Sequence, residues 1–215
     1  MKNSSKYLGN ELKYLKLVLN KKLPKNANSW RQSFEEKFAR KYKKKFAISF
    51  NSGTSTLHAA LASCGVKPGD EVISPALTVI MDTSATIHSH AIPVYADIDE
   101  DDFNIRPEEI EKKITKKTKA IITVSVFGQS PKMDLIKKIA NKHKIRIIED
   151  NAESMFSTYN NKIIGHYGDI SSFSFENSKH LSCGEGGVTI TNDKILAKKM
   201  RKFSNHGFIK LNSNS

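Results

Sequence analysis

The sequence predicts an α/β fold of three layers, in which helices cover both faces of a mainly parallel sheet of seven strands. From Phe46 onward, short apolar runs alternate with segments of helical periodicity, and this alternation favours right-handed crossovers. The 215 residues, 38% of them hydrophobic, suffice for one such domain. Strands are expected at residues 46–50, 71–74, 92–96, 120–124, 145–148, 171–175 and 188–191, and helices at 53–64, 78–88, 107–114, 131–143 and 193–205.

The N-terminal stretch is expected to be an arm and not a domain. It contains one short amphipathic segment, with leucines among lysines, and then a polar loop. The helix that follows carries Trp30, Phe34 and Phe38 at every fourth position, which predicts one apolar stripe used for core packing. We therefore divide the chain into an arm over residues 1–29 and a domain over residues 30–215.

The charge of the chain, +13, raises the possibility of a basic nucleic-acid binder, because clustered lysines release counterions from a phosphate backbone. The lysines gather on the polar faces of expected helices, without interleaved aromatic residues. A solvated, lysine-rich surface explains this pattern better, so no nucleic-acid partner is expected.

Targeting and cysteine signals point to a protein of the cytoplasm. The N-terminus lacks the apolar core of a secretory signal, and no apolar run approaches membrane-spanning length, so no membrane partner is expected. Cys64 and Cys183 have no metal-type spacing, which favours free thiols over a disulfide or a metal site.

Polar motifs follow two of the expected strands, where ligands of open α/β sheets bind. Gly53 and Thr54 follow the strand at 46–50 and open a helix, an arrangement suited to a phosphate, although an ordinary N-cap has the same appearance. Asp150 and Glu153 end the strand at 145–148, and here too a helix-capping aspartate is the plainer alternative.

The run SSFSFENSKHLSCGEGG, residues 171–187, places Lys179 between a buried strand and a glycine-dense bend. Most lysines are solvated surface charges, and that remains the alternative. Close packing around this one would lower its pKa toward the neutral amine that attacks carbonyls. Lys179 is therefore the candidate nucleophile.

This run resembles the cofactor-lysine signature of the DegT/DnrJ/EryC1/StrS sugar aminotransferases, and separate motifs continue the resemblance from about Trp30 to Gly207. The resemblance implies the large domain of a pyridoxal-phosphate (PLP) transferase, without the small C-terminal domain of the family. It also implies a catalytic Lys179 that carries PLP covalently. The remaining cofactor-binding residues that it implies are Gly53, Thr54 and Ser174 for the phosphate, Asp150 for the pyridine nitrogen, Glu153 near the phenolic oxygen, and Val79 against the ring, where relatives commonly carry an aromatic residue.

The function that the resemblance implies is transfer of an amino group from glutamate to a nucleotide-linked 4-keto-6-deoxy sugar, in the synthesis of cell-surface polysaccharides or glycoconjugates. Similar sugar dehydratases carry histidine in place of the cofactor lysine, whereas here His180 is only its neighbour. The partners implied are the nucleotide sugar, the amino-acid donor and a second copy in a homodimer. The alternative is a truncated, catalytically impaired remnant that binds PLP or serves as an interaction module.

Overall fold

The structure is a computed structural model, and it describes residues 9–208. The first eight residues of the expected arm and the last seven of the expected domain lie outside this range. Seven strands form one sheet in the order β1-β9-β8-β5-β4-β2-β3, of which only β9 runs antiparallel to its neighbours, so the predicted mainly parallel sheet is confirmed. The strands are β1 (Phe46–Phe50), β2 (Glu71–Pro75), β3 (Ile92–Ala96), β4 (Thr118–Val124), β5 (Arg146–Asp150), β8 (Ile170–Ser174) and β9 (Gly187–Thr191).

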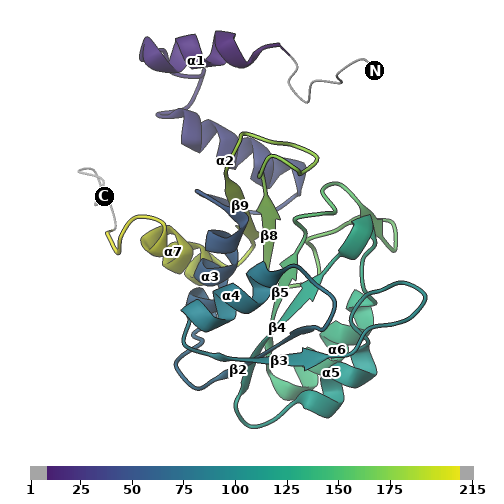
Figure 1. Ribbon diagram of the computed structural model, residues 1–215. Helices are drawn as coiled ribbons and strands as arrows, with labels where there is room; N and C mark the ends of the chain where they lie inside the picture. The colour runs from purple at the N-terminus through teal and green to yellow at the C-terminus, as the bar shows by residue number, and fades with distance from the viewer. Residues whose placement is uncertain (1–8, 209–215) are drawn as a thin grey trace.

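Helices lie on both faces of the sheet (Figure 1), as the three-layer prediction requires. Ile122 packs with the helices of one face, and Ile121 packs with those of the other, because successive strand residues point in opposite directions. Helices α3, α4 and α7 cover the first face, and α2, α5 and α6 cover the second. The helices are α1 (Glu11–Leu19), α2 (Trp30–Lys41), α3 (Gly53–Ser63), α4 (Ile80–His88), α5 (Pro107–Lys113), α6 (Met133–His143) and α7 (Lys194–Phe203).

Aromatic residues of α2 join the core under β8, but the expected stripe is buried only at its end. Phe38 is buried and lies 5.3 Å from the ring of Phe173, measured between centroids. Phe34 is 37% exposed, and Trp30 contacts Tyr14 of α1 at 5.8 Å instead of entering the core. The prediction that the whole stripe packs in the core was therefore wrong, because α2 extends beyond the edge of the sheet (Figure 1).

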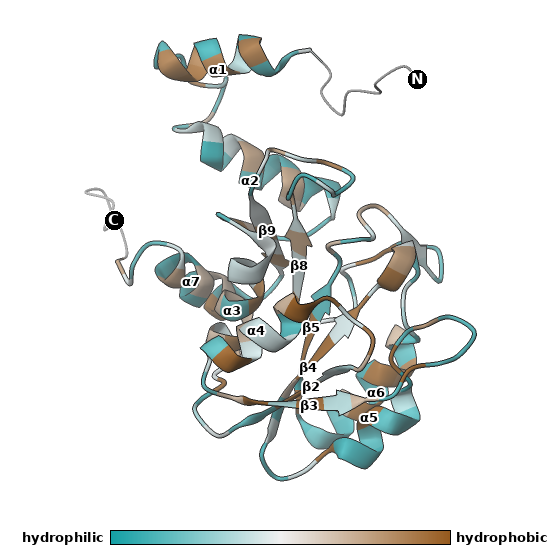
Figure 2. Ribbon diagram, in the orientation of Figure 1, coloured by the Kyte–Doolittle hydropathy of each residue, from teal (hydrophilic) through white to brown (hydrophobic). Residues whose placement is uncertain are grey.

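The first helix, α1, stands away from the sheet and has no buried residue. Figure 2 nevertheless shows hydrophobic residues along it. Its large apolar side chains are exposed, Leu12 by 62% and Leu19 by 79%. This position agrees with the expected arm, whose boundary stays a prediction.

Two short elements were not expected from the sequence. A 3-10 turn, η1 (Val126–Gly128), follows β4, and a two-stranded hairpin, β6 (Thr158–Tyr159) with β7 (Lys162–Ile163), follows β5. Strands of two residues carry too little periodicity to be predicted.

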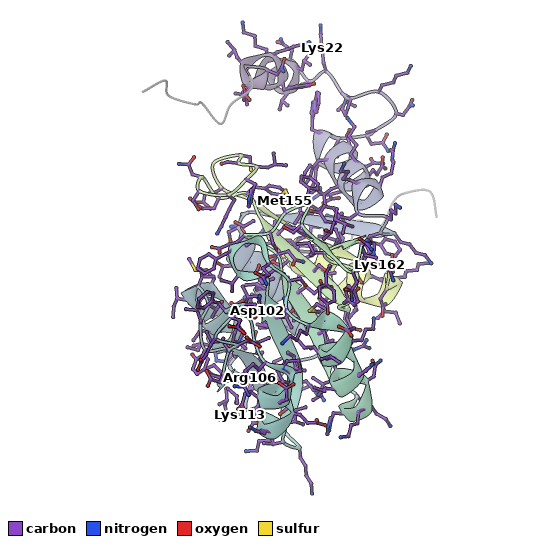
Figure 3. The ribbon with its side chains drawn as sticks, turned by 90° about the vertical axis from the view of Figure 1, so that its right-hand side faces the viewer. Lys22, Asp102, Arg106, Lys113, Met155 and Lys162 are labelled. Carbon is purple, nitrogen blue, oxygen red and sulfur yellow. The ribbon has the colours of Figure 1, made fainter. Side chains whose placement is uncertain are left out.

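The lysines are spread over the molecule. Figure 3 shows Lys22, Lys113 and Lys162 in three separate regions, as a solvated lysine-rich surface would have them. Among residues 9–208, no helix combines the length and the apolar character that crossing a bilayer demands. Cys64 and Cys183 are free thiols, as expected.

The turn after β3 is held together by its own carboxylates. Asp99 accepts a hydrogen bond from the amide of Asp101 and pairs with Lys132 at 3.1 Å. Asp102, labelled in Figure 3 together with Arg106, accepts one from the amide of Asn104. These carboxylates shape the turn.

Candidate active site

A cavity of about 410 Å³ opens at the carboxyl ends of the strands, where ligands of such sheets bind. Every residue that the sequence singled out for the site lines this one cavity, although these residues come from four separate segments of the chain. They are Gly53, Thr54, Val79, Asp150, Glu153, Ser174 and Lys179.

Lys179 lies on the loop that joins β8 to β9. Backbone hydrogen bonds from Phe175 to Gly186 and from Cys183 to Phe175 hold the base of this loop. Within it, the Glu176 carboxylate accepts bonds from the amide and the hydroxyl of Ser178, and the carbonyl of Glu176 accepts one from the Lys179 amide. The loop thus has a defined turn that presents Lys179 to the cavity.

The surroundings of Lys179 differ from those expected. Its side chain is 16% exposed, and its ammonium lies 3.3 Å from Oε1 of Glu153. The sequence predicted close backbone packing, whereas the structure puts a carboxylate beside the lysine at the wall of a cavity. The carboxylate belongs to a segment 26 residues away, so the sequence could not reveal the pair.

The start of α3 and the end of β8 are in contact. A Cβ atom on Gly53 would lie 2.9 Å from Cβ of Ser174 and 3.1 Å from its Oγ, so glycine is what allows this approach. Thr56 extends the contact, with its hydroxyl 2.5 Å from that of Ser172. Gly187 of β9 lies against the same turn, where a Cβ would meet the carbonyl oxygen of Ser52 at 2.4 Å.

Several hydrogen-bond donors at this contact are unused. Ser52 caps α3, since its Oγ accepts from the Ser55 amide and its carbonyl from the Thr56 amide. Within residues 9–208, the amides of Gly53 and Thr54 have no acceptor. The Oγ of Ser174 accepts a bond from Glu176, which leaves its own proton available to a ligand. The motif is therefore an N-cap that also leaves donors at the cavity, and its use as a phosphate site stays a prediction.

Asp150 ends β5 with its side chain toward the cavity, whereas Glu149 before it points to the other face. Glu149 is bound there by the amides of Gly165 and Tyr167, both at 2.9 Å, and so is structural. One oxygen of Asp150 accepts a bond from the Ala152 amide at 3.0 Å. Burial raises the pKa of Asp150 above its usual value, opposed by this amide and by the charge of Lys179.

Behind Asp150 lies a second carboxyl group, that of Asp82 in the first turn of α4. Asp82 is fully buried, its Oδ2 accepts from the Thr78 hydroxyl, and its Oδ1 has no partner among the groups assigned as donors in residues 9–208. The two carboxyl groups lie close enough together for each to shift the pKa of the other. Burial and then the charge of Asp150 hold the pKa of Asp82 well above its usual value.

Val79 forms an aliphatic wall. It is the N-cap residue of α4 and lies between the main cavity and a neighbouring apolar cavity of about 190 Å³. The expected helix began at 78, two residues too early. The side chain of Val79 is half-buried and available for contact with a flat ligand.

Sequence reasoning missed several lining residues. Glu176 and Glu185 stand in the run that was singled out for Lys179, but nothing in that run showed which of its side chains face inward. Asp82, which does not line the cavity, was missed as well, because a carboxylate in the first turn of a helix is ordinary and its burial does not show in the sequence. The other lining residues not foreseen are Ser52, Leu57, Met81, Ala152 and Ser178.

The chain is similar to known proteins in both sequence and structure. The model of the DegT/DnrJ/EryC1/StrS aminotransferase family matches residues 8–214. "Spore coat polysaccharide biosynthesis protein SpsC" of Bacillus subtilis is 43% identical over 179 residues, 83% of this chain and 46% of its own. "GDP-perosamine synthase" of Escherichia coli O157:H7 is 38% identical over 199 residues, 93% of this chain and 55% of its own.

Solved structures agree with these matches. Bacillus subtilis NtdA, solved with bound cofactor PMP, aligns with a TM-score of 0.86 and 34% identity over 95% of this chain and 46% of that chain. The chain spans about half the length of the relatives that it matches. Its three-layer architecture, with the mainly parallel seven-stranded sheet, agrees with the large-domain fold of PLP aminotransferases.

Proposed function

Because this chain belongs to the DegT/DnrJ/EryC1/StrS aminotransferase family, we propose that it acts as a PLP-dependent sugar-nucleotide aminotransferase. In this proposal Lys179 is the catalytic residue, and Gly53, Thr54, Val79, Asp150, Glu153 and Ser174 bind the cofactor. The observation that carries the proposal is their position: all seven residues line one cavity at the carboxyl ends of the strands.

The donor groups around Gly53 fit a phosphate. The amides of Gly53 and Thr54 stand at the start of α3 with no acceptor among residues 9–208, and the side chain of Ser174 lies against Gly53. An anion is stabilised there by the helix dipole as well as by these donors. A side chain at position 53 would fill the space, so the glycine itself supports the assignment.

Asp150 fits the nitrogen of a pyridine ring. Its carboxylate is buried and faces the cavity, where it would hold a protonated ring nitrogen through an ion pair and a hydrogen bond. When bound, PLP supplies an electron sink that stabilises negative charge at the α-carbon of an amino acid. Val79 and Met81 give the cavity apolar walls that would exclude water from the ring.

Lys179 and Glu153 fit the reacting end of the cavity. The amine of Lys179 attacks an aldehyde carbon only when it is neutral, so it would first have to give up a proton and leave its ion pair with Glu153, which lies at 3.3 Å. When its amine is free, Lys179 would be placed to hold and move a proton at the α-carbon of the amino-acid substrate. Glu153 would also lie near the phenolic oxygen of the cofactor.

The substrates are proposed from the relatives. GDP-perosamine synthase and a spore coat polysaccharide biosynthesis protein are among them, and these names support a nucleotide-linked keto sugar as amino acceptor. We infer a 4-keto-6-deoxy sugar, glutamate as the donor, and a product used in cell-surface polysaccharides or glycoconjugates. The cytoplasm remains the expected location.

A homodimer and the division at residue 30 remain predictions as well. Apolar side chains that are exposed near the cavity support contact with a second copy. They are Leu77 at 42%, Ile80 at 66%, Met81 at 44% and Phe127 at 78%. Sedimentation equilibrium of the purified chain tests the dimer, and a monomer at every concentration would contradict it.

The proposal is tested by adding PLP to the purified protein and recording the visible absorption before and after glutamate. Borohydride reduction and peptide mass spectrometry then locate the modified residue. The matched variants are Lys179→Ala and Lys162→Ala, the latter on the exposed hairpin labelled in Figure 3. We expect modification of Lys179 in the wild type and in Lys162→Ala, and a spectral change on adding glutamate.

Two results would decide against the proposal. A folded protein that binds no PLP at Lys179 would overturn it outright. Amino transfer to nucleotide-linked keto sugars is measured by mass spectrometry of the sugar. If PLP binds covalently but no such sugar is aminated, the alternative of a PLP-binding or interaction module is favoured.

A further inference from the structure

The pair formed by Asp82 and Asp150 combines two buried carboxyl groups of different accessibility. Asp150 lines the cavity, whereas Asp82 does not and is 0% exposed. Two adjacent carboxylates in a site of low dielectric constant cannot both be ionised, so the pair holds one proton. The chemistry of the site depends on which member carries it.

The neighbours of the two groups favour a charged Asp150. Burial, which both groups share, raises the pKa of Asp150 most, and the charge of Glu153 raises it further, but Asp150 has the Ala152 amide at 3.0 Å and the positive charge of Lys179 to stabilise its charged form. Asp82 has the Thr78 hydroxyl and no cation. The proton is therefore more stable on Asp82.

The free oxygen of Asp82 supports the same assignment. Its Oδ1 is buried and receives no bond from any group assigned as a donor in residues 9–208. A carboxylate oxygen in that position would cost the desolvation of an unpaired acceptor, about 1–3 kcal/mol or more. A hydroxyl in the same place would be able to donate to Asp150, and that bond would satisfy both groups.

We propose that Asp82 is a positioning residue, whose neutral carboxyl group donates a hydrogen bond to Asp150 and keeps that carboxylate charged and directed into the cavity. The inference rests on the proposed function in one respect, namely that Asp150 holds the pyridine nitrogen of PLP. The state of Asp82 itself is a property of the protein without cofactor. The two can therefore fail separately.

The first measurement is infrared spectroscopy of the cofactor-free protein at neutral pH. A protonated carboxyl group absorbs apart from carboxylates, so wild type minus Asp82→Asn should show one such band. Asp134→Asn is the matched control, because the Tyr159 hydroxyl lowers the pKa of that carboxyl and keeps it ionised. A difference spectrum for Asp82→Asn that lacks this band would overturn the proposal, whether or not PLP binds.

The second measurement is the PLP dissociation constant as a function of pH, by equilibrium dialysis. Asp82→Leu fills the space but cannot donate, so we expect about tenfold weaker binding and a loss of affinity that begins at higher pH. Asp82→Asn can donate through its amide and should recover most of this affinity, a rescue that a purely structural role does not predict. Wild-type affinity and pH dependence in Asp82→Leu would contradict the proposal.

If Asp82→Leu does not fold, the infrared comparison still decides the question. If no variant and no wild type binds PLP, the proposed function fails while the protonation state of Asp82 remains measured.

Discussion

The ammonium of Lys179 lies 3.3 Å from a carboxylate oxygen of Glu153, across the cavity wall that joins the β8–β9 loop to the end of β5. The lysine side chain is 16% exposed and that of Glu153 is 33% exposed, so solvent weakens the pair without removing it.

Removing the charge of Glu153 should make Lys179 more reactive. In Glu153→Gln the amine of Lys179 no longer has to leave an ion pair before it reacts. We expect its reaction with a small aldehyde probe to accelerate about two- to fivefold, a modest factor because the pair is partly exposed to solvent. Quantitative mass spectrometry of Lys179 in the cofactor-free protein measures this rate. Glu185→Gln, which removes a cavity carboxylate without an ion pair to the lysine, should change it little. Equal rates in both variants would show that the pair does not restrain the amine.

Gly53→Ala should both destabilise the protein and weaken PLP binding. The new Cβ would stand 2.9 Å from Cβ of Ser174, and the separation of α3 from β8 that relieves it should cost about 1–3 kcal/mol. Urea unfolding and equilibrium dialysis measure the two effects. In the double variant with Ser174→Gly the crowding is gone, so the costs should not be additive. Strict additivity would mean that the two residues do not touch.

Replacing Asp150 by asparagine should stabilise the cofactor-free protein at neutral pH. Burial raises the pKa of Asp150 to about 6, so the folded protein holds its proton more tightly than the unfolded chain does. A group shifted upward loses stability as pH rises from its unfolded pKa, about 4, through its folded pKa. The gain in Asp150→Asn should therefore be near zero below pH 4 and reach roughly 2–3 kcal/mol by pH 7.

Urea unfolding of the wild type and Asp150→Asn at a series of pH values tests this. The variant should at the same time lose PLP affinity. A gain that shrinks as pH rises would have the wrong sign and would contradict the assignment.

Glu35 should matter for stability well beyond an ordinary surface charge. It is 7% exposed and accepts bonds from the amide and hydroxyl of Ser49, at 2.8 and 2.7 Å, and from Arg201. It thereby ties α2 to β1 and α7. Glu35→Ala should cost about 2–3 kcal/mol, reduced from the value for a fully buried pair because Arg201 is 33% exposed.

The melting temperatures of Glu35→Ala and Glu36→Ala test this prediction. Glu36 is the matched control, since it is exposed and hydrogen-bonded to Gln32. A similar melting temperature for both variants would show that Glu35 contributes no more than its exposed neighbour.

Local sequence patterns predicted most of the sheet. The bounds of β1 and β3 match the expected strands, and the other strands differ by one or two residues at one end or at both. Each of these strands is a short apolar run bounded by turn residues, so the signal is contained in the segment itself. The cap of α2 is equally local, with Ser29 accepting a bond from the amide of Gln32 at 3.0 Å.

What the sequence could not predict depends on distant contacts. The placement of β9 between β1 and β8, the partner of Lys179, and the pairing of Asp82 with Asp150 all join segments that are far apart along the chain. The exposure of Phe34 has the same origin, because its surroundings depend on where α2 leaves the sheet. Periodicity shows which face of an element is apolar but not what covers it.

The pairing of the first strand with the last has a consequence for the order of folding. Ile48 and Thr189 are in contact although 141 positions separate them. During synthesis β1 therefore leaves the ribosome long before β9 exists, and its edge stays unpaired meanwhile. Contacts of such long range also form slowly. Since Gly53 follows β1 and Ser174 precedes β9, we expect the cavity to be among the last parts of the protein to assemble, a delay that pulsed hydrogen exchange during refolding would detect as late protection of β1.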